Sequence, residues 1–217
     1  MLKTIDCPRE LRTFNSLFFE FQYRHDAYVV FDDLLTIFIC CLARETEEKL
    51  YFETIKRYSK KELNIFAKMY AELFILYQKA KEENDWIDPL GDYYEVLSSS
   101  SKKSRFGQFF SPKNLCDMMA QMIITPNEWG KNILEPASGS GRMVLAANQI
   151  ANGNYFIAKD LDGLCCKMTA INMCLHEIRG EVHHTNALSS QTPFLSYSIN
   201  YKFYSHRTPI ILLKRYS

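Results

Sequence analysis

Apolar side chains recur at helical spacing through the first part of the chain, and this pattern predicts a helical N-terminal segment. The apolar positions are Phe14, Leu17, Phe18 and Phe21, then Leu34, Leu35, Phe38 and Leu42, then Phe66, Tyr70, Leu73, Phe74 and Tyr77. Ser59 followed by Glu62 is a capping box, so the third helix is expected to start there and to end near Lys81, ahead of the helix-breaking stretch Asp88 to Gly91. The aromatic stripes are expected to face a core.

The run from Ala27 to Ala43 is apolar but carries Asp32 and Asp33. It is too short to span a bilayer, which takes about 20 apolar residues in a helix. A buried helix of a protein without membrane segments is therefore expected.

Short apolar runs alternate with helical patterns in the second half of the chain. Strands are predicted at Asn132–Leu134, Tyr155–Ala158 and Glu181–His184, and helices at Asn114–Ile124, from Arg142 onward and at Gly163–His176. Such alternation is typical of an open, mostly parallel α/β sheet.

The C-terminal part changes to strict alternation. Tyr197, Ile199, Tyr201 and Phe203 alternate with polar residues, and the run Ile210–Leu213 follows a turn. A hairpin that completes the sheet and keeps its edge charged is the favoured interpretation. A basic hairpin that grips nucleic acid through phosphates and stacking is the alternative.

Bulk composition narrows the class of protein only slightly. The 217 residues are 47% apolar with a net charge of +1, which argues neither for nor against a nucleic-acid partner. The seven cysteines are odd in number and lack metal-ligand spacing, so no zinc site is expected. No secretory signal follows Met1, and a cytoplasmic protein with reduced thiols is the simplest expectation.

A polar, basic stretch from Ser98 to Arg105 separates the two patterns. It predicts a boundary between a helical subdomain, residues 1–97, and an α/β domain, residues 98–217. The stretch is interpreted as a solvated loop, with contact to a phosphate backbone as the alternative.

The stretch Glu135 to Gly141 reads Glu-Pro-Ala-Ser-Gly-Ser-Gly and lies between a predicted strand and a predicted helix. A phosphate-binding loop would need Lys-Ser/Thr where Arg142 and Met143 stand. The dinucleotide fingerprint would need a third glycine at Val144. An acid ahead of Gly-x-Gly instead suits a ligand with a cationic group, such as the ammonium of S-adenosylmethionine, although a turn without any ligand could share the pattern.

Several motifs in order resemble the N-6 adenine DNA methylase family, especially the modification subunits of type I restriction systems. Residues 107–112, Gly-Gln-Phe-Phe-Ser-Pro, resemble the family's Gly-Gln-Tyr-Phe-Thr-Pro element, and residues 135–141 resemble its Asp/Glu-Pro-x-x-Gly-Ser/Thr-Gly loop. Residues 160–162 with 170–173, and then 186–188, resemble its second and third strand ends. The likeness covers residues 104–188. It implies a Rossmann-like SAM-dependent methyltransferase sheet behind a helical N-terminal subdomain, S-adenosylmethionine as cofactor, DNA as partner, and a specificity or other partner subunit in restriction-modification.

The resemblance also implies roles for individual residues. Asp160, 25 residues after Glu135 (160 − 135 = 25), would accept the ribose hydroxyls, and Asn186 would read the adenine edge. Glu135 would pair with the methionine ammonium. Phe109 and Phe110 would offer a flat surface, with one of the two expected in the core, and Ser111 would reach the methionine end. The residues predicted to bind the cofactor are Gln108, Phe109, Phe110, Ser111, Pro112, Lys113, Glu135, Ala137, Gly139, Ser140, Gly141, Arg142, Asp160 and Asn186.

The family's catalytic motif, Asn/Asp-Pro-Pro-Tyr/Phe, is not found. The nearest match, Gln191 to Phe194, begins five residues after Asn186, whereas an intervening helix and strand would need roughly 15 residues. This stretch is therefore predicted to be a loop, and no catalytic residue is assigned. Three hypotheses remain: a methyltransferase with a shortened C-terminal half, a SAM-binding regulator or subunit without catalysis, and a DNA-binding module on a degenerate scaffold.

Overall fold

The structure, a computed structural model, describes residues 7–100, 110–189, 191–201 and 208–216. The described helices are the 3-10 turn η2 (Arg9–Leu11), α1 (Arg12–Phe19), α2 (Ala27–Leu42), α3 (Glu48–Ile55), α4 (Lys60–Glu82), α5 (Pro89–Ser100), α6 (Lys113–Ile123), α7 (Arg142–Ile150) and α8 (Gly163–Leu175). The described strands are β1 (Asn132–Glu135), β2 (Tyr155–Asp160), β3 (Arg179–His184), β4 (Leu195–Ile199) and β5 (Ile211–Arg215).

The capping box predicted at the start of α4 is confirmed. The Ser59 hydroxyl accepts the Glu62 backbone N–H, and the Glu62 carboxylate accepts the Ser59 backbone N–H at 2.7 Å. The buried face of α4 includes Phe66, Leu73 and Tyr77, as predicted. Phe74 differs, because its side chain is 46% exposed. It lies one position away from the buried Leu73, and a neighbour in sequence points about 100° away around a helix.

The expected buried helix is α2, whose buried face includes Leu34, Leu35 and Phe38. Asp26 caps it by accepting the backbone N–H of Tyr28 at 2.9 Å. Within the part of the chain that the structure describes, no helix combines the length and apolarity needed to cross a membrane.

The sheet has five strands in the order β1-β2-β3-β4-β5. The first two pairings are parallel and the last two are antiparallel. The prediction of a mostly parallel sheet is therefore corrected to a mixed one. Only a short connection lies between His184 and Leu195, and a parallel crossover needs a dozen or more residues, so β4 must return antiparallel.

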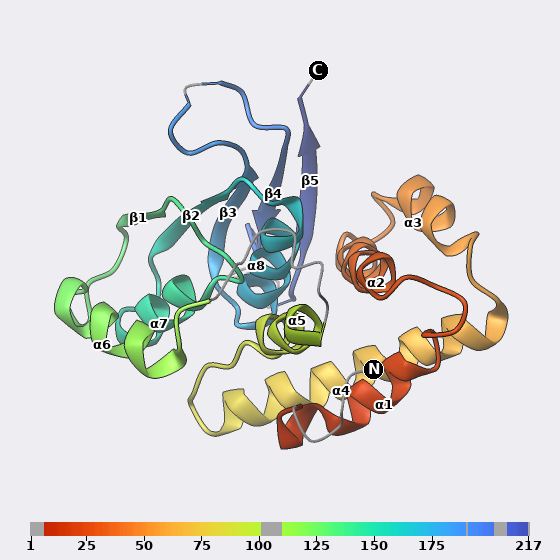
Figure 1. Ribbon diagram of the computed structural model, residues 1–217. Helices are drawn as coiled ribbons and strands as arrows, with labels where there is room; N and C mark the ends of the chain where they lie inside the picture. The colour runs from red at the N-terminus through yellow and green to blue at the C-terminus, as the bar shows by residue number, and fades with distance from the viewer. Residues whose placement is uncertain (1–6, 101–109, 190, 202–207, 217) are drawn as a thin grey trace.

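Helices cover the side of the sheet that is nearer to the N-terminal segment. Helix α8 contacts β2, β3, β4 and β5, and helices α2 and α5 pack in turn on α8 (Figure 1). Helix α6 packs on α7 near β1, which forms one edge of the sheet. The helical segment is thus built onto the sheet through α8.

Two predictions for the C-terminal part are confirmed. Residues 191–194 form neither helix nor strand, and β4 and β5 form an antiparallel hairpin on β3. At the outer edge Lys214 is exposed, and Arg215 pairs with Glu47 at 2.5 Å. The favoured interpretation, a hairpin that completes the sheet, therefore holds, while residues 202–207 of this prediction lie outside the described residues.

The predicted loop from Ser98 to Arg105 is partly helical, because α5 continues to Ser100. Residues 101–105 lie outside the described part of the chain. The division into residues 1–97 and 98–217 stays a prediction.

Candidate ligand site at the carboxyl end of the parallel strands

A tight turn joins β1 to α7 and owes its shape to two glycines. Gly139 and Gly141 have φ values of +54° and +99°, a region that other residues rarely adopt. The Gly141 N–H donates to the Ser138 carbonyl at 2.7 Å and closes the turn. The chain then enters α7 directly at Arg142.

Strand β2 and helix α8 hold this turn in place. The Ser138 N–H donates to the Lys159 carbonyl at 2.9 Å, and the Gly139 N–H donates to Asp160 Oδ2 at 2.8 Å. From α8, the Thr169 hydroxyl donates to the Gly139 carbonyl at 2.8 Å. The turn is therefore fixed from two sides before any ligand is considered.

The two acids singled out from the sequence lie at the same edge of the sheet. Glu135 is paired with Ala158 across β1 and β2, and Asp160 follows two residues later on β2. Asn186 comes directly after Thr185, whose N–H donates to the Asp160 carbonyl at 2.8 Å. The carboxyl ends of the parallel strands thus gather all three side chains, at the edge where open α/β sheets bind ligands.

A cavity of about 200 Å³ opens at this turn. Its lining residues are Phe110, Ser111, Cys116, Ala137, Ser138, Gly139, Ser140, Arg142, Met143, Asp160 and Cys165. Small-molecule pockets typically measure about 300–1,000 Å³. We therefore expect a ligand of nucleoside size to fill this cavity and extend past the exposed Ala137.

The structure places the predicted site residues in three groups. Seven of them line the cavity: Phe110, Ser111, Ala137, Gly139, Ser140, Arg142 and Asp160. Five do not line it: Pro112, Lys113, Glu135, Gly141 and Asn186. Gln108 and Phe109 lie outside the described residues.

Among the residues off the cavity, Glu135 and Asn186 are at its edge of the sheet and bind their own loops. Glu135 Oε1 accepts the Ala137 N–H at 3.0 Å, and Asn186 Oδ1 accepts the Leu188 N–H at 3.0 Å. The second carboxylate oxygen of Glu135 is left for other donors, since a carboxylate accepts up to about four hydrogen bonds.

Lys113 points away from the cavity. Its ammonium donates to Asp85 at 2.8 Å and lies 3.8 Å from the centre of the Trp86 ring. This cation–π contact and ion pair hold the side chain against Asp85 and Trp86, just before α5, so its position does not favour a direct role at the cavity.

Phe110 is half-buried and contributes both packing and cavity wall. Its ring packs on Tyr94 at 5.6 Å between centroids, and a Cβ atom at Gly139 would lie 2.9 Å from it. The aromatic ring therefore covers the glycine turn directly, and only a residue without a side chain fits beneath it.

Arg142 is 7% exposed, and each of its three guanidinium nitrogens donates to the protein. It donates to Asp88 at 2.7 Å, to Asp92 at 2.8 Å and to Glu95 at 3.1 Å. Burial acts to lower the pKa of Arg142, but the charges of Asp88, Glu95 and Asp92 together with the Asp88 hydrogen bond raise it. Burial and the neighbouring Asp88 raise the pKa of Asp92 to about 6.

Sequence reasoning missed Asp88, Asn172 and four cavity-lining residues, Cys116, Ser138, Met143 and Cys165. A usable signal existed for Asp88. Asp followed directly by Pro is typical of a helix start, with Asp at the N-cap and Pro at the first helical position. Asp88 does cap α5, because its side chain accepts the Gly91 N–H at 2.8 Å. Ser138 and Asn172 lie inside the motifs at residues 135–141 and 170–173, whereas no local pattern marks Cys116, Met143 and Cys165.

The cavity offers polar groups for binding a ligand from the glycine turn and from Asp160. The residues that the structure describes contain no group of three or more His, Cys, Asp or Glu side chains arranged to hold a metal ion. Burial raises the pKa of the lining thiols of Cys116 and Cys165, so neither is a ready nucleophile.

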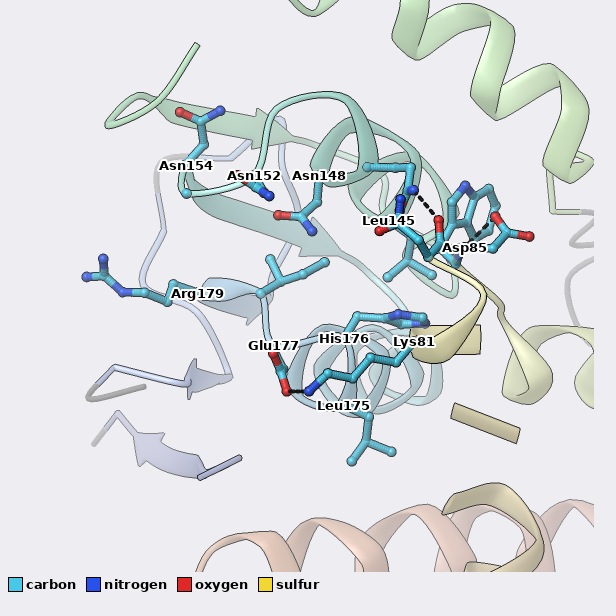
Figure 2. A pocket seen from close by; sticks show the side chains of 15 residues that line it. Lys81, Asp85, Leu145, Asn148, Asn152, Asn154, Leu175, His176, Glu177 and Arg179 are labelled. Atoms are coloured by element: carbon cyan, nitrogen blue, oxygen red, sulfur yellow. Dashed lines mark hydrogen bonds and ion pairs between the residues drawn. The ribbon is translucent and has the colours of Figure 1, made fainter. Parts of the chain in front are cut away.

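A second cavity of about 410 Å³ lies at the opposite edge, near the first residues of β2 and β3 (Figure 2). Its lining is polar and includes Asn148, Asn152 and the ion pair of Lys81 with Glu177. Open α/β sheets bind ligands outside the carboxyl ends of their strands, so the cavity beside the glycine turn is the better candidate.

Comparison with known proteins points to one family. The model of the family described as N-6 DNA Methylase matches residues 85–200, more than half of the 217 residues. The crystal structure of the type I restriction-modification system methyltransferase subunit from Streptococcus thermophilus is similar to this chain with a TM-score of 0.42 and 21% identity. The aligned part covers 65% of this chain and 32% of that one, so the chain spans about a third of that subunit.

Proposed function

Because the chain belongs to the N-6 DNA methylase family, we propose that it binds S-adenosylmethionine in the cavity beside the glycine turn. The observation that carries this proposal is Asp160. Its carboxylate lines the cavity at the end of β2 and holds the Gly139 N–H, which puts an acceptor and a close backbone side by side.

The polar groups around the cavity suit this cofactor. Asp160 already accepts one N–H on each oxygen, from Gly139 at 2.8 Å and from Asp162 at 2.9 Å, and keeps lone pairs for ribose hydroxyls. Glu135 would pair with the ammonium group, and Phe110 and Ser111 would lie alongside the methionine end. The bound cofactor would supply an electrophilic methyl group; the residues named here hold and orient it.

The sequence lacks the family's motif for base recognition, Asn/Asp-Pro-Pro-Tyr/Phe. Adenine N6 needs two acceptors and a stacking ring, and the only Pro-Phe pair near the expected position is Pro193 with Phe194. Phe194 is 66% exposed, and its N–H donates to the His184 carbonyl at 2.9 Å. We therefore propose a SAM-binding protein whose methyl transfer to double-stranded DNA is weak or absent without a partner subunit.

Calorimetry tests the cofactor part of the proposal. Titration of S-adenosylmethionine into the wild type is expected to release or absorb heat with a defined affinity, and Asp160→Ala is expected to lower that affinity at least tenfold. Asp26→Ala serves as the matched control, because it also removes a carboxylate that holds backbone N–H groups, but at the start of α2. Equal heats for the wild type and Asp160→Ala would remove the proposal.

Incubation with tritiated S-adenosylmethionine and mixed-sequence DNA tests the catalytic part. We expect no incorporation above background from this chain alone. Robust incorporation would show an acceptor site in this chain and would favour the first hypothesis, a methyltransferase with a shortened C-terminal half. No binding of S-adenosylmethionine would favour the third, a DNA-binding module on a degenerate scaffold.

A further inference from the structure

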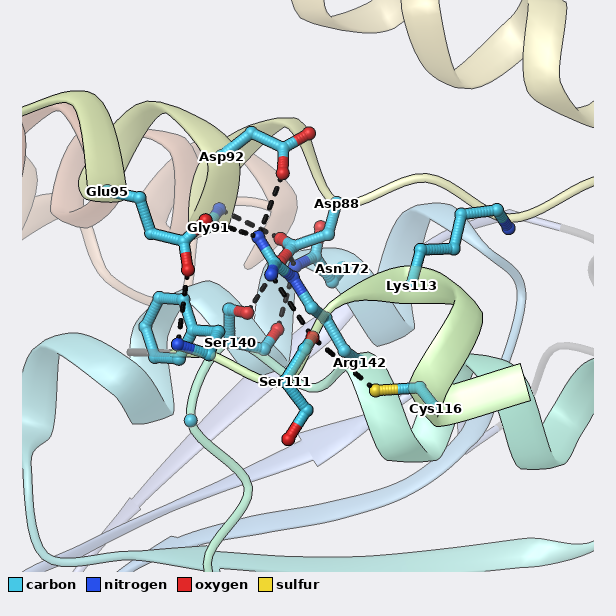
Figure 3. Close-up of polar contacts among 12 residues, drawn as sticks. Asp88, Gly91, Asp92, Glu95, Ser111, Lys113, Cys116, Ser140, Arg142 and Asn172 are labelled. Atoms are coloured by element: carbon cyan, nitrogen blue, oxygen red, sulfur yellow. Dashed lines mark hydrogen bonds and ion pairs between the residues drawn. The ribbon is translucent and has the colours of Figure 1, made fainter. Parts of the chain in front are cut away.

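Asp88 is the centre of a buried polar network next to the glycine turn (Figure 3). Its Oδ1 accepts the Gly91 N–H at 2.8 Å and the Asn172 amide at 2.7 Å. Its Oδ2 accepts the Ser140 hydroxyl at 2.5 Å and Arg142 Nε at 2.7 Å. All four acceptor positions of this carboxylate are thus filled by protein donors.

These donors come from three separate elements. Gly91 is in the first turn of α5, Asn172 is on α8, and Ser140 with Arg142 forms the end of the glycine turn and the start of α7. A single carboxylate therefore joins α5 to α7 and α8, the two helices that flank the cavity.

Ser140 is held at both its side chain and its backbone. Its hydroxyl donates to Asp88, and its carbonyl accepts the Asn172 amide at 2.8 Å. Ser140 lies between the two left-handed glycines, so these contacts fix the part of the turn with the softest backbone. Arg142 adds a contact to the opposite wall, since its guanidinium donates to the Ser111 carbonyl at 3.2 Å.

Asp88 itself does not line the cavity, whereas Ser140 and Arg142 do. We infer that Asp88 is a positioning residue, which acts through Ser140 and Arg142 to hold residues 137–141 in their ligand-binding shape. The expected consequence for cofactor affinity rests on the proposed function, whereas the effect of Asp88 on the shape of the turn needs no ligand. Asp88 and the start of α5 are then part of the site and not merely packed beside it.

A buried carboxylate that accepts four hydrogen bonds from protein donors has one favourable arrangement. Burial raises the pKa of Asp88, and the charge of Arg142 and the hydrogen bonds oppose that rise. Asp88→Asn replaces one acceptor oxygen by an NH₂ group that faces donors, so at least one donor must turn away. Because the Gly91 N–H is fixed by its helix, the remaining oxygen is expected to stay with Gly91 and Asn172, and the NH₂ group then faces the donors of Ser140 and Arg142.

The test compares Asp88→Asn with Asp33→Asn. Asp33 is also a buried carboxylate, but its partners Tyr58 and Arg57 lie in the helical segment. Both variants are expected to lose stability in urea. Hydrogen exchange of the Gly139 and Gly141 amides is expected to accelerate at least tenfold in Asp88→Asn and less than threefold in Asp33→Asn, without any ligand present. Affinity for S-adenosylmethionine is expected to fall at least tenfold only in Asp88→Asn.

Ser140→Ala is the milder second variant if Asp88→Asn does not fold. It removes one donor to Asp88, and we expect about threefold faster exchange at Gly139 with a smaller loss of stability than in Asp88→Asn. Equal exchange rates at the two glycines in all three variants and the wild type would overturn the inference. If the wild type fails to bind S-adenosylmethionine, the proposed function falls, while the exchange comparison still decides the role of Asp88.

Discussion

The hydroxyl of Tyr77 donates a 2.5 Å hydrogen bond to Asn172 Oδ1, across 95 residues of sequence. Both side chains are buried, Tyr77 on α4 and Asn172 on α8. The same Asn172 donates its amide to Asp88 and to the Ser140 carbonyl. Helix α4 is therefore linked to the glycine turn by two hydrogen bonds through Asn172.

Tyr77→Phe removes this link and leaves Asn172 Oδ1 buried without its donor. We expect a loss of about 1–3 kcal/mol in the free energy of unfolding, the usual cost of an unsatisfied buried acceptor. Urea denaturation followed by circular dichroism measures it. Tyr23→Phe is the control, because Tyr23 is 87% exposed, and a loss in Tyr77→Phe no larger than in that control would contradict the prediction.

Gly139→Ala and Gly130→Ala form a matched pair. Both glycines have positive φ, but a Cβ at Gly139 would press on the Phe110 ring, whereas a Cβ at Gly130 meets nothing within 4 Å. Gly130→Ala is expected to cost about 1–2 kcal/mol from backbone strain alone. Gly139→Ala should cost more and lower the affinity for S-adenosylmethionine at least tenfold. Equal losses of stability and affinity in calorimetry and urea titration would show that Phe110 moves freely.

Glu62 gives the protein a defined acid sensitivity. Hydrogen bonds from the Ser59 side chain and backbone lower the pKa of Glu62 to about 2, from an ordinary value of 4.5. The folded state therefore binds this proton less tightly than the unfolded state, so the contribution is present above pH 4.5 and is lost as the pH falls toward 2. Glu62→Gln is expected to be roughly 1–2 kcal/mol less stable at pH 7.

The measurement for Glu62 is urea unfolding of the wild type and Glu62→Gln at several pH values between 7 and 2. The gap between the two proteins should narrow steadily below pH 4.5. Glu20→Gln is the control, because Glu20 is 54% exposed and its nearest cation, Lys61, is 3.8 Å away. A gap that stays constant down to pH 2 would show that the capping bond, and not the charge, stabilises the helix.

Phe194→Ala asks whether the loop before β4 takes part in any transfer reaction. Phe194 is mostly exposed and its ring centre lies 5.1 Å from that of His184. We expect the affinity for S-adenosylmethionine to stay within twofold of the wild type and the stability within about 0.5 kcal/mol. If a partner subunit confers methyl transfer, loss of that activity in Phe194→Ala at unchanged cofactor affinity would assign the stacking role to this ring.

The features that the sequence determined by itself are local ones. The capping box at Ser59 and Glu62, the strand–turn–helix around Gly139 and the loop at residues 191–194 each depend on neighbours within a few positions, so their residue types suffice to predict them. The edge position of Asp160 also follows, because a residue that ends a parallel strand must lie at the carboxyl end of the sheet.

Tertiary structure decided how each charge in the site is used. Lys113 and Arg142, both predicted to face a cofactor, have acidic partners at Asp85 and Asp88 that no local pattern assigns to them. The pairing of β4 with β3, residue against residue, was likewise visible only in the folded chain. A buried charge must find a partner, and the nearest one belongs to another element, 54 residues away for Arg142 and Asp88, so only the folded chain brings the two together.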